Sequence, residues 1–182
     1  GARSIQLGES EIVVAGGMEN MSQAPYLLPG ARDGWRMGHQ QAIDSMVHDG
    51  LWCSLEHWHM GLAGEAVADR YAVSREDQDT FAAASHHKAA QAIRECWFKD
   101  EILPVEVPQR KGDPIRLEYD ESVRPDTSTE ALGRLRPAFK KEGGSVTAGN
   151  APGVNDGAAA VVVMAAEKAD ELGIAPMARI VG

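Results

Sequence analysis

The sequence of 182 residues is poor in cysteine and in aromatic residues, and it lacks any apolar run long enough to span a bilayer. Its two cysteines, Cys53 and Cys96, are too few for a disulfide framework and show no metal-binding spacing, which predicts a reducing compartment such as the cytoplasm. We expect each cysteine to be a small buried side chain rather than a nucleophile. Without a bilayer-length apolar run, no membrane partner is expected.

Basic residues are outnumbered by acidic ones. The chain has 18 Lys and Arg against 27 Asp and Glu, a formal net charge of −9, which disfavours a nucleic-acid partner. Hydrophobic residues make up 43% of the chain, which is typical of a globular protein. The opening residues, Gly1 to Ser4, contain neither a methionine start nor a secretory apolar segment, so we expect the chain to belong to a longer sequence.

The two ends of the chain predict an α/β structure. Glu11–Ala15 is a short apolar run before Gly16-Gly17, which favours a strand buried on both faces. Ala158–Met164 is either a buried strand or the start of a helix, and Glu167–Leu172 is a helix stopped by Gly173. Ala178–Gly182 has the pattern of a further strand.

The middle of the chain, from about Gln23 to Gly144, begins with a long stretch marked by glycine and proline. A helix is expected over Gly64–Ala72, and a second one after Ser74, which is followed by acidic residues as an N-cap should be. Its packing face is predicted to be Phe81, Ser85, Ala89, Ala92 and Ile93. We further expect an edge strand within Ile102–Val107, a charged turn at Arg110–Asp113, a solvated His86-His87 pair, and β structure at Ser145–Thr147.

Sequence motifs for chemistry are incomplete. The chain has no phosphate-binding Gly-Lys-Ser/Thr loop, no dinucleotide-binding glycine pattern and no Gly-x-Ser-x-Gly elbow. His57 and His59 flank Trp58, but two histidines alone favour a core or ligand-wall role over a metal site. Ala148–Gly157 is equally consistent with a tight turn and with backbone close to an elongated ligand.

Several segments in order resemble the thiolase family. Any one is weak, but the ordered set runs the length of the chain and is specific. These segments are Ala15–Ser22, Arg36–His39, Asp44–Met46, Asp49–Leu51, His59–Gly61, Ser74–Asp79, Arg136–Phe139 and Thr147–Ala160.

The resemblance implies a layered αβαβα fold of the α/β class, built from two similar halves. Residues 1–22 would be the end of the N-terminal half, and residues 23–144 an inserted loop domain with an oligomerisation arm and a coenzyme A (CoA)-binding wall. Residues 145–177 would be the last strand and helix of the N-terminal half, and residues 178–182 the start of the C-terminal half.

The resemblance also implies transfer of an acetyl or acyl group between CoA thioesters through a cysteine thioester. Cys53 and Cys96 do not match the family's catalytic cysteine motifs, so no catalytic residue is assigned in this chain, and no metal. CoA or acetyl-CoA would be a substrate, with no tightly bound cofactor, in a homotetramer working in fatty acid metabolism. The alternatives are a non-catalytic acyl-CoA-binding module, a broad-chain degradative 3-ketoacyl-CoA thiolase, and a decarboxylating condensing enzyme on the same fold.

The residues that the resemblance assigns to CoA lie in the second and third quarters of the chain and just beyond. Leu51, His59 and Met60 match the pantetheine tunnel, Arg124 a basic residue near the adenine end, and Phe139, Ala148, Ala151 and Pro152 the wall beside pantetheine. Pro152 departs from the family's usual serine and offers neither hydroxyl nor N–H. Cys53–Trp58 also departs from the family pattern, and Pro25–Met37 matches the loop through which many members form tetramers.

Overall fold

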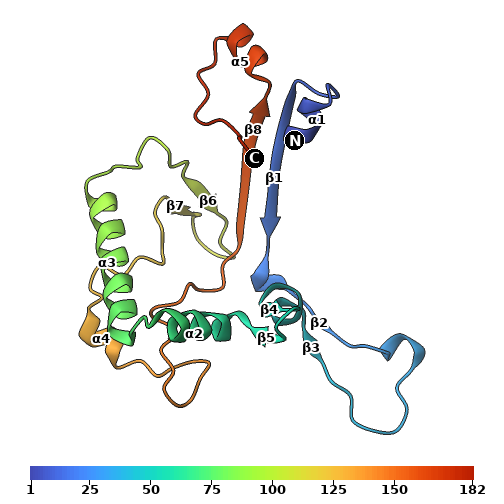
Figure 1. Ribbon diagram of the computed structural model, residues 1–182, viewed down its shortest axis with the longest axis vertical. Coiled ribbons are helices and arrows are strands. Elements are labelled where there is room, and N and C mark those ends of the chain that lie inside the picture. The colour runs from blue at the N-terminus through green and yellow to red at the C-terminus, as the bar shows by residue number, and fades with distance from the viewer. The chain divides into compact units, whose positions relative to one another are not determined.

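The computed structural model describes all residues, Gly1–Gly182, and divides into two compact units. The first unit combines Gly1–His48 with Val154–Gly182, and the second comprises Asp49–Gly153. Figure 1 shows the elements of each unit. None of the helices is both long and apolar enough to cross a membrane.

A long two-stranded antiparallel ribbon forms the centre of the first unit (Figure 1). Strand β1 (Ile12–Glu19) pairs with β8 (Gly157–Met164) over eight residues, from Ile12 opposite Met164 to Glu19 opposite Gly157. The strand therefore continues through Gly16-Gly17 instead of ending there. Gly16 is required because an added Cβ would overlap the carbonyl oxygen of Ala159 on β8. The second apolar run is thus a strand, which decides between the two alternatives left open by its sequence.

The expectation that β1 is buried on both faces is wrong for this chain. Val14 is 73% exposed, and on the partner strand Val161 and Val162 are 60% and 61% exposed. A two-stranded ribbon has too few neighbours to bury both faces of either strand. The apolar pattern is therefore compatible with a strand but does not tell how many layers cover it.

Two short helices lie together at one end of the ribbon (Figure 1). Helix α1 (Ala2–Gln6) precedes β1, and α5 (Ala166–Leu172) follows β8 and ends at Gly173, whose φ of 66° closes it as expected. Ala178–Gly182 forms no strand, contrary to expectation, because no other segment of the chain pairs with it. Beyond the other end of the ribbon, the Ser22 N–H and hydroxyl donate to the Asp156 carboxylate at 2.9 and 2.6 Å.

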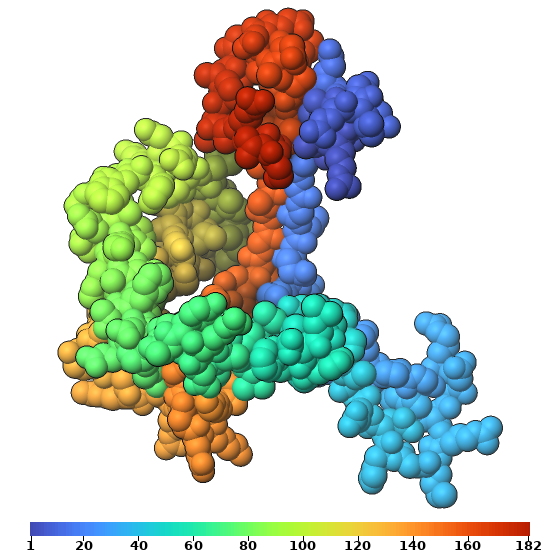
Figure 2. Space-filling view, viewed as in Figure 1, coloured from blue at the N-terminus to red at the C-terminus, as the bar shows by residue number.

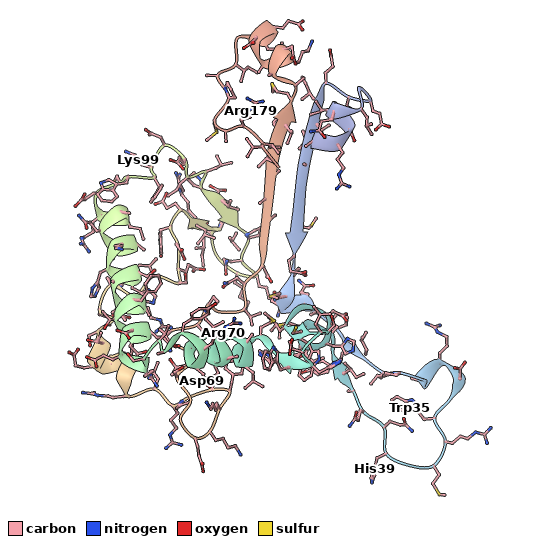
Figure 3. The ribbon with its side chains drawn as sticks, in the orientation of Figure 1. Trp35, His39, Asp69, Arg70, Lys99 and Arg179 are labelled. Atoms are coloured by element: carbon pink, nitrogen blue, oxygen red, sulfur yellow. The ribbon has the colours of Figure 1, made fainter.

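Residues 20–50, which run from the end of β1 to just past the boundary of the first unit at His48, are mostly irregular, as the glycines and prolines predict. It contains η1 (Met21–Gln23), β2 (Tyr26–Leu27), η2 (Ala31–Asp33), β3 (Ile43–Asp44) and the π-helical η3 (Met46–Gly50). Strands β2 and β3 pair at the base of an open loop, which Figure 2 shows in light blue. Inside that loop the Trp35 indole N–H donates to the Pro29 carbonyl at 3.0 Å (Figure 3).

Two helices dominate the second unit. A small hairpin of β4 (Trp52–Cys53) and β5 (Trp58–His59) leads directly into α2 (Met60–Tyr71), which begins four residues earlier than predicted. Helix α3 (Arg75–Arg94) begins after Ser74, as predicted, with a complete capping box between Ser74 and Asp77.

The predicted packing face of α3 is mostly wrong. Phe81 is 76% exposed and Ile93 43% exposed, and of the five predicted residues only Ala92 is buried. The buried side chains are instead Asp79, Ala83, Ala90 and Ala92. Small residues allow the neighbouring backbone to approach this face closely, and a buried carboxylate is tolerated there because it is fully hydrogen-bonded. In this helix, large apolar residues are exposed and a carboxylate is buried, so residue polarity did not predict which side chains are buried.

The remaining elements are short. Strands β6 (Val105–Val107) and β7 (Ile115–Leu117) form a hairpin around the charged turn, and α4 (Thr129–Gly133) packs against α3. Ser145–Thr147 is not a strand, contrary to expectation. It is nevertheless buried, because the Ser145 and Val146 N–H groups donate to Glu65 on α2 and the Thr147 N–H donates to Asn150, instead of to a neighbouring strand.

Candidate functional site

The N-terminus of α2 carries two of the residues assigned to the CoA site, His59 and Met60. His59 caps the helix, its Nδ1 accepting the Gly61 N–H at 3.0 Å. The Met60 N–H donates to the Leu51 carbonyl at 2.9 Å, which brings the start of the β4–β5 hairpin to the same place. Met60 is 48% exposed, so its thioether side chain is available at the surface.

Phe139, which lies 80 residues further along the chain than His59, packs on this helix end. Its ring stacks on the His59 imidazole with 4.8 Å between ring centroids and an interplanar angle of 28°. A Cβ added at Gly61 would overlap the Phe139 ring, so glycine is what lets the ring sit directly on the helix backbone. His59 and Phe139 thus form one aromatic surface, with the Met60 backbone and the Leu51 carbonyl joined beside it.

Glu65 holds the segment that carries Phe139. This side chain is only 3% exposed, and its carboxylate accepts the Ser145 N–H at 2.9 and 3.0 Å, the Ser145 hydroxyl at 3.0 Å and the Val146 N–H at 2.9 Å. The Val146 carbonyl in turn accepts the Ala138 N–H at 2.9 Å. The residue before Phe139 is therefore tied to a segment that α2 fixes.

Charge also favours this arrangement. Burial alone raises the pKa of Glu65, but the hydrogen bonds from Val146 and Ser145, together with the Lys140 ammonium, outweigh it and leave this pKa below its usual value of 4.5. Lys140 forms an exposed ion pair with Asp69 at 2.9 Å, and that carboxylate raises the pKa of Lys140. Figure 3 shows Asp69 on the side of α2 that faces the loop before Ser145.

The glycine-rich segment Thr147–Ala151 forms a closed turn. The Thr147 side chain is fully buried, and its hydroxyl and carbonyl accept the N–H groups of Gly149 at 3.2 Å and Ala151 at 3.1 Å. Ala148 and Pro152 are exposed on this turn and Ala151 is half-buried. Because Ala148 lies two residues after Val146, the turn directly follows the segment that bonds to Ala138.

Arg124 is held elsewhere, on α3. Its N–H donates to His86 Nδ1 at 3.2 Å, and the neighbouring His87 donates to the Thr127 carbonyl at 2.8 Å. The two histidines therefore bind the 124–127 segment, which corrects the prediction of a merely solvated pair. No hydrogen bond or ring contact joins Arg124 to Phe139 or Met60, and its expected place near the adenine end of CoA stays a prediction.

Other candidate features lie apart from this surface. Two open hollows belong to the first unit, one lined by residues 28–33 and the other by residues 17–19 and 155–159. No group of three or more His, Cys, Asp or Glu side chains could hold a metal ion. Cys96 is exposed and Cys53 half-buried, so the prediction that both cysteines are buried is wrong.

Comparison with known families gives one match over most of the chain: the thiolase N-terminal domain, across residues 1–167. The chain belongs to the thiolase family. An acetyl-CoA acetyltransferase of Pseudomonas aeruginosa is 55% identical over 180 residues, 99% of this thiolase chain and 46% of the relative. A Staphylococcus aureus relative, named a probable acetyl-CoA acyltransferase, is 54% identical over 99% of the chain and 46% of its own length.

Solved structures support the same assignment. The acetyl-CoA acetyltransferase of Syntrophomonas wolfei matches with a TM-score of 0.87 at 44% identity, covering 96% of this chain and 43% of that one. The Bacillus anthracis acetyl-CoA acetyltransferase matches with a TM-score of 0.85 at 43% identity, covering 96% and 44%. The chain thus has the thiolase fold expected from its motifs, and spans just under half the length of the relatives that it matches.

Two structurally important residues of this thiolase chain were not singled out by the sequence. Glu65 and Asp79 are each 3% exposed, yet both lie in helices where an acidic side chain is ordinarily solvated. The only local signal was the Arg75–Asp79 spacing, which places opposite charges one turn apart on the same face of α3. Their partners lie about 70 to 80 residues away.

Proposed function

We propose that this chain supplies acyl-CoA binding to an acetyl-CoA C-acetyltransferase, which transfers an acetyl group between CoA thioesters to form or cleave acetoacetyl-CoA. The observation that carries the proposal is the stack of His59 on Phe139 at the start of α2. Beside it, Met60 adds an exposed thioether side chain. Such a flat aromatic surface suits the pantetheine arm of CoA, which is long and lacks charge.

The turn Thr147–Ala151 and Pro152 extend this wall in the proposal. Backbone can approach an elongated ligand closely where side chains are small, and Ala148, Gly149 and Ala151 supply that condition. Arg124 is proposed to meet the phosphates near the adenine end of CoA, since its guanidinium could form paired hydrogen bonds with phosphate oxygens. No residue of this chain is proposed to form the acyl-cysteine intermediate.

The relatives named acetyl-CoA acetyltransferase favour the acetyl group. The Staphylococcus aureus relative's name specifies only an acyl group, and this observation favours a broader-chain thiolase as the second candidate. The β4–β5 hairpin, where the sequence departs from the family at Cys53–Trp58, would line the acyl pocket in either case. Its His57 has a positive φ of 56°, so the hairpin turn has an unusual backbone that could reshape the pocket.

The direct test is to express the whole gene product and measure CoA-dependent cleavage of acetoacetyl-CoA. We expect thiolysis that iodoacetamide abolishes, since the proposed intermediate is a cysteine thioester. Comparing acetoacetyl-CoA with 3-ketooctanoyl-CoA separates the two candidates, because only the broader enzyme would cleave both well. A folded protein that binds CoA but cleaves neither substrate would instead identify a non-catalytic acyl-CoA-binding module.

We also propose a cytoplasmic homotetramer in which the loop between β2 and β3 joins protomers. The support is the exposure of large apolar side chains on this loop and on the strand before it, including Tyr26 of β2 (66%), Leu28 (50%) and Met37 (103%). Light scattering on the whole gene product would test it, since the change Tyr26→Asp together with Met37→Asp should lower the mass from four protomers.

A further inference from the structure

Asp79 is a buried carboxylate that connects two distant parts of the second unit. It is 3% exposed, and its Oδ2 accepts the Arg75 Nε–H at 2.7 Å within α3. Its Oδ1 accepts the Asn150 side-chain amide at 2.9 Å, from a residue 71 positions further along the chain. Each carboxylate oxygen thus serves a different donor.

Asn150 extends this connection to the start of the turn and to the segment before it. Its amide nitrogen also donates to the Ser145 carbonyl at 2.9 Å, and its Oδ1 accepts the Thr147 N–H at 2.7 Å. One side chain therefore fixes the start of the turn and the segment leading into it. Asp79 in turn fixes the direction in which the Asn150 amide points, because it accepts one of the two amide protons.

The other side of the turn is held by the end of α4. A Cβ added at Gly149 would approach Leu132 and Leu135 to 2.5 Å, so there is no free space there. Arg75 bonds to the carbonyl oxygens of the same two leucines, at 2.7 and 3.0 Å. The turn is thus enclosed between the end of α4 and the Asp79 carboxylate.

We propose that Asp79 is a positioning residue for acyl-CoA: through Asn150 it sets the Ala148–Ala151 backbone against the ligand. This inference rests on the proposed acyl-CoA-binding function, and it adds a residue that does not itself touch the ligand. The change Asp79→Asn tests it, because an amide has only one oxygen for the two donors on Arg75 and Asn150. One donor must lose its partner, and the turn is then free to shift.

The experiment is calorimetric titration of CoA into the whole gene product. Loss of one charge-assisted hydrogen bond should weaken CoA binding roughly tenfold in Asp79→Asn. Asp77→Asn is the matched control, since Asp77 lies half a turn away on α3 and bonds only to Ser74. The control should bind CoA within about twofold of the wild type, although it also weakens the start of the helix.

Equal CoA affinity in wild type and a folded Asp79→Asn variant would overturn the proposal, as would an equal loss in Asp77→Asn. A wild-type protein that does not bind CoA would reject the proposed function itself, which is a different result. If Asp79→Asn does not fold, amide hydrogen exchange of the wild type decides. CoA should slow exchange both at residues 148–151 and in the second turn of α3. Slower amide exchange at residues 148–151 alone, without slower exchange in α3, would contradict the proposed link between Asp79 and the turn.

Discussion

The His59 imidazole and the Phe139 ring are stacked, with centroids 4.8 Å apart, at the point where α2 begins. Two different sequence regions meet here, and neither side chain is fully buried. His59 has two tasks, since its Nδ1 also caps the helix by accepting the Gly61 N–H. The same imidazole therefore orients the helix end and presents an aromatic face to Phe139.

Removing Phe139 should weaken CoA binding. We expect Phe139→Ala to cost about 0.5–1.5 kcal/mol of stacking at His59 and to remove part of the proposed pantetheine wall. CoA affinity, measured by calorimetry, should fall about 3- to 10-fold. Phe81→Ala is the control, because Phe81 is 76% exposed on α3 and should leave affinity unchanged. Unaltered CoA binding in Phe139→Ala would argue against the wall.

The packing of the Phe139 ring against the Gly61 backbone predicts the effect of adding one methyl group at Gly61. In Gly61→Ala the new Cβ would overlap the Phe139 ring, so the ring must leave its place on His59. Overpacking of this kind should cost about 1–3 kcal/mol of stability and lower CoA affinity. Gly133→Ala is the matched control, since that helical glycine has nothing within 4 Å of an added Cβ. Chemical denaturation would measure both variants, and equal stability in the two would contradict the close contact.

The low pKa of Glu65 predicts a pH-dependent contribution to stability. Because this pKa is below 4.5 in the folded state, the stabilisation is fully present above pH 4.5 and is lost as the pH falls through the folded-state value. At pH 7, Glu65→Gln should destabilise the protein by about 1–3 kcal/mol, since buried N–H groups lose their acceptor.

The difference in unfolding free energy between wild type and Glu65→Gln should therefore stay constant from pH 7 to about 4.5 and shrink as the pH is lowered further, through the folded-state pKa of Glu65. Other carboxylates titrate alike in the two proteins, so their effects cancel in the difference. Urea unfolding monitored by tryptophan fluorescence would follow it. A difference that does not shrink below pH 4.5 would contradict a lowered pKa of Glu65 in the folded protein.

Placing at position 152 the serine that the thiolase resemblance leads us to expect there should strengthen CoA binding. A serine hydroxyl adds one hydrogen bond to pantetheine, worth about 0.5–1.5 kcal/mol, or about 2- to 10-fold in affinity. Pro152→Ala separates the hydroxyl from the loss of the proline ring, because it changes the backbone in the same way without adding the group. If Pro152→Ser and Pro152→Ala bind CoA equally, position 152 does not contact pantetheine as proposed.

Local chemistry was the part of the structure that the sequence predicted best. Ser74 caps α3 and Gly173 ends α5, because each of these effects depends only on residues within one helical turn. The apolar runs gave β1 and β8, although not their pairing or exposure. Predictions that required knowledge of neighbours failed, as with the packing face of α3 and the strand expected at Ala178–Gly182.

The sequence by itself determined the family, since an ordered set of short motifs along the chain is specific even when each is weak. It also identified His59, Met60 and Phe139 as candidates. Only the tertiary structure decided that Phe139 lies on Gly61 and that Glu65 binds a segment 80 residues away. Such contacts depend on the path of the whole intervening backbone. The sequence does not distinguish a buried carboxylate from a solvated one, because burial depends on hydrogen-bond partners that lie far away along the chain.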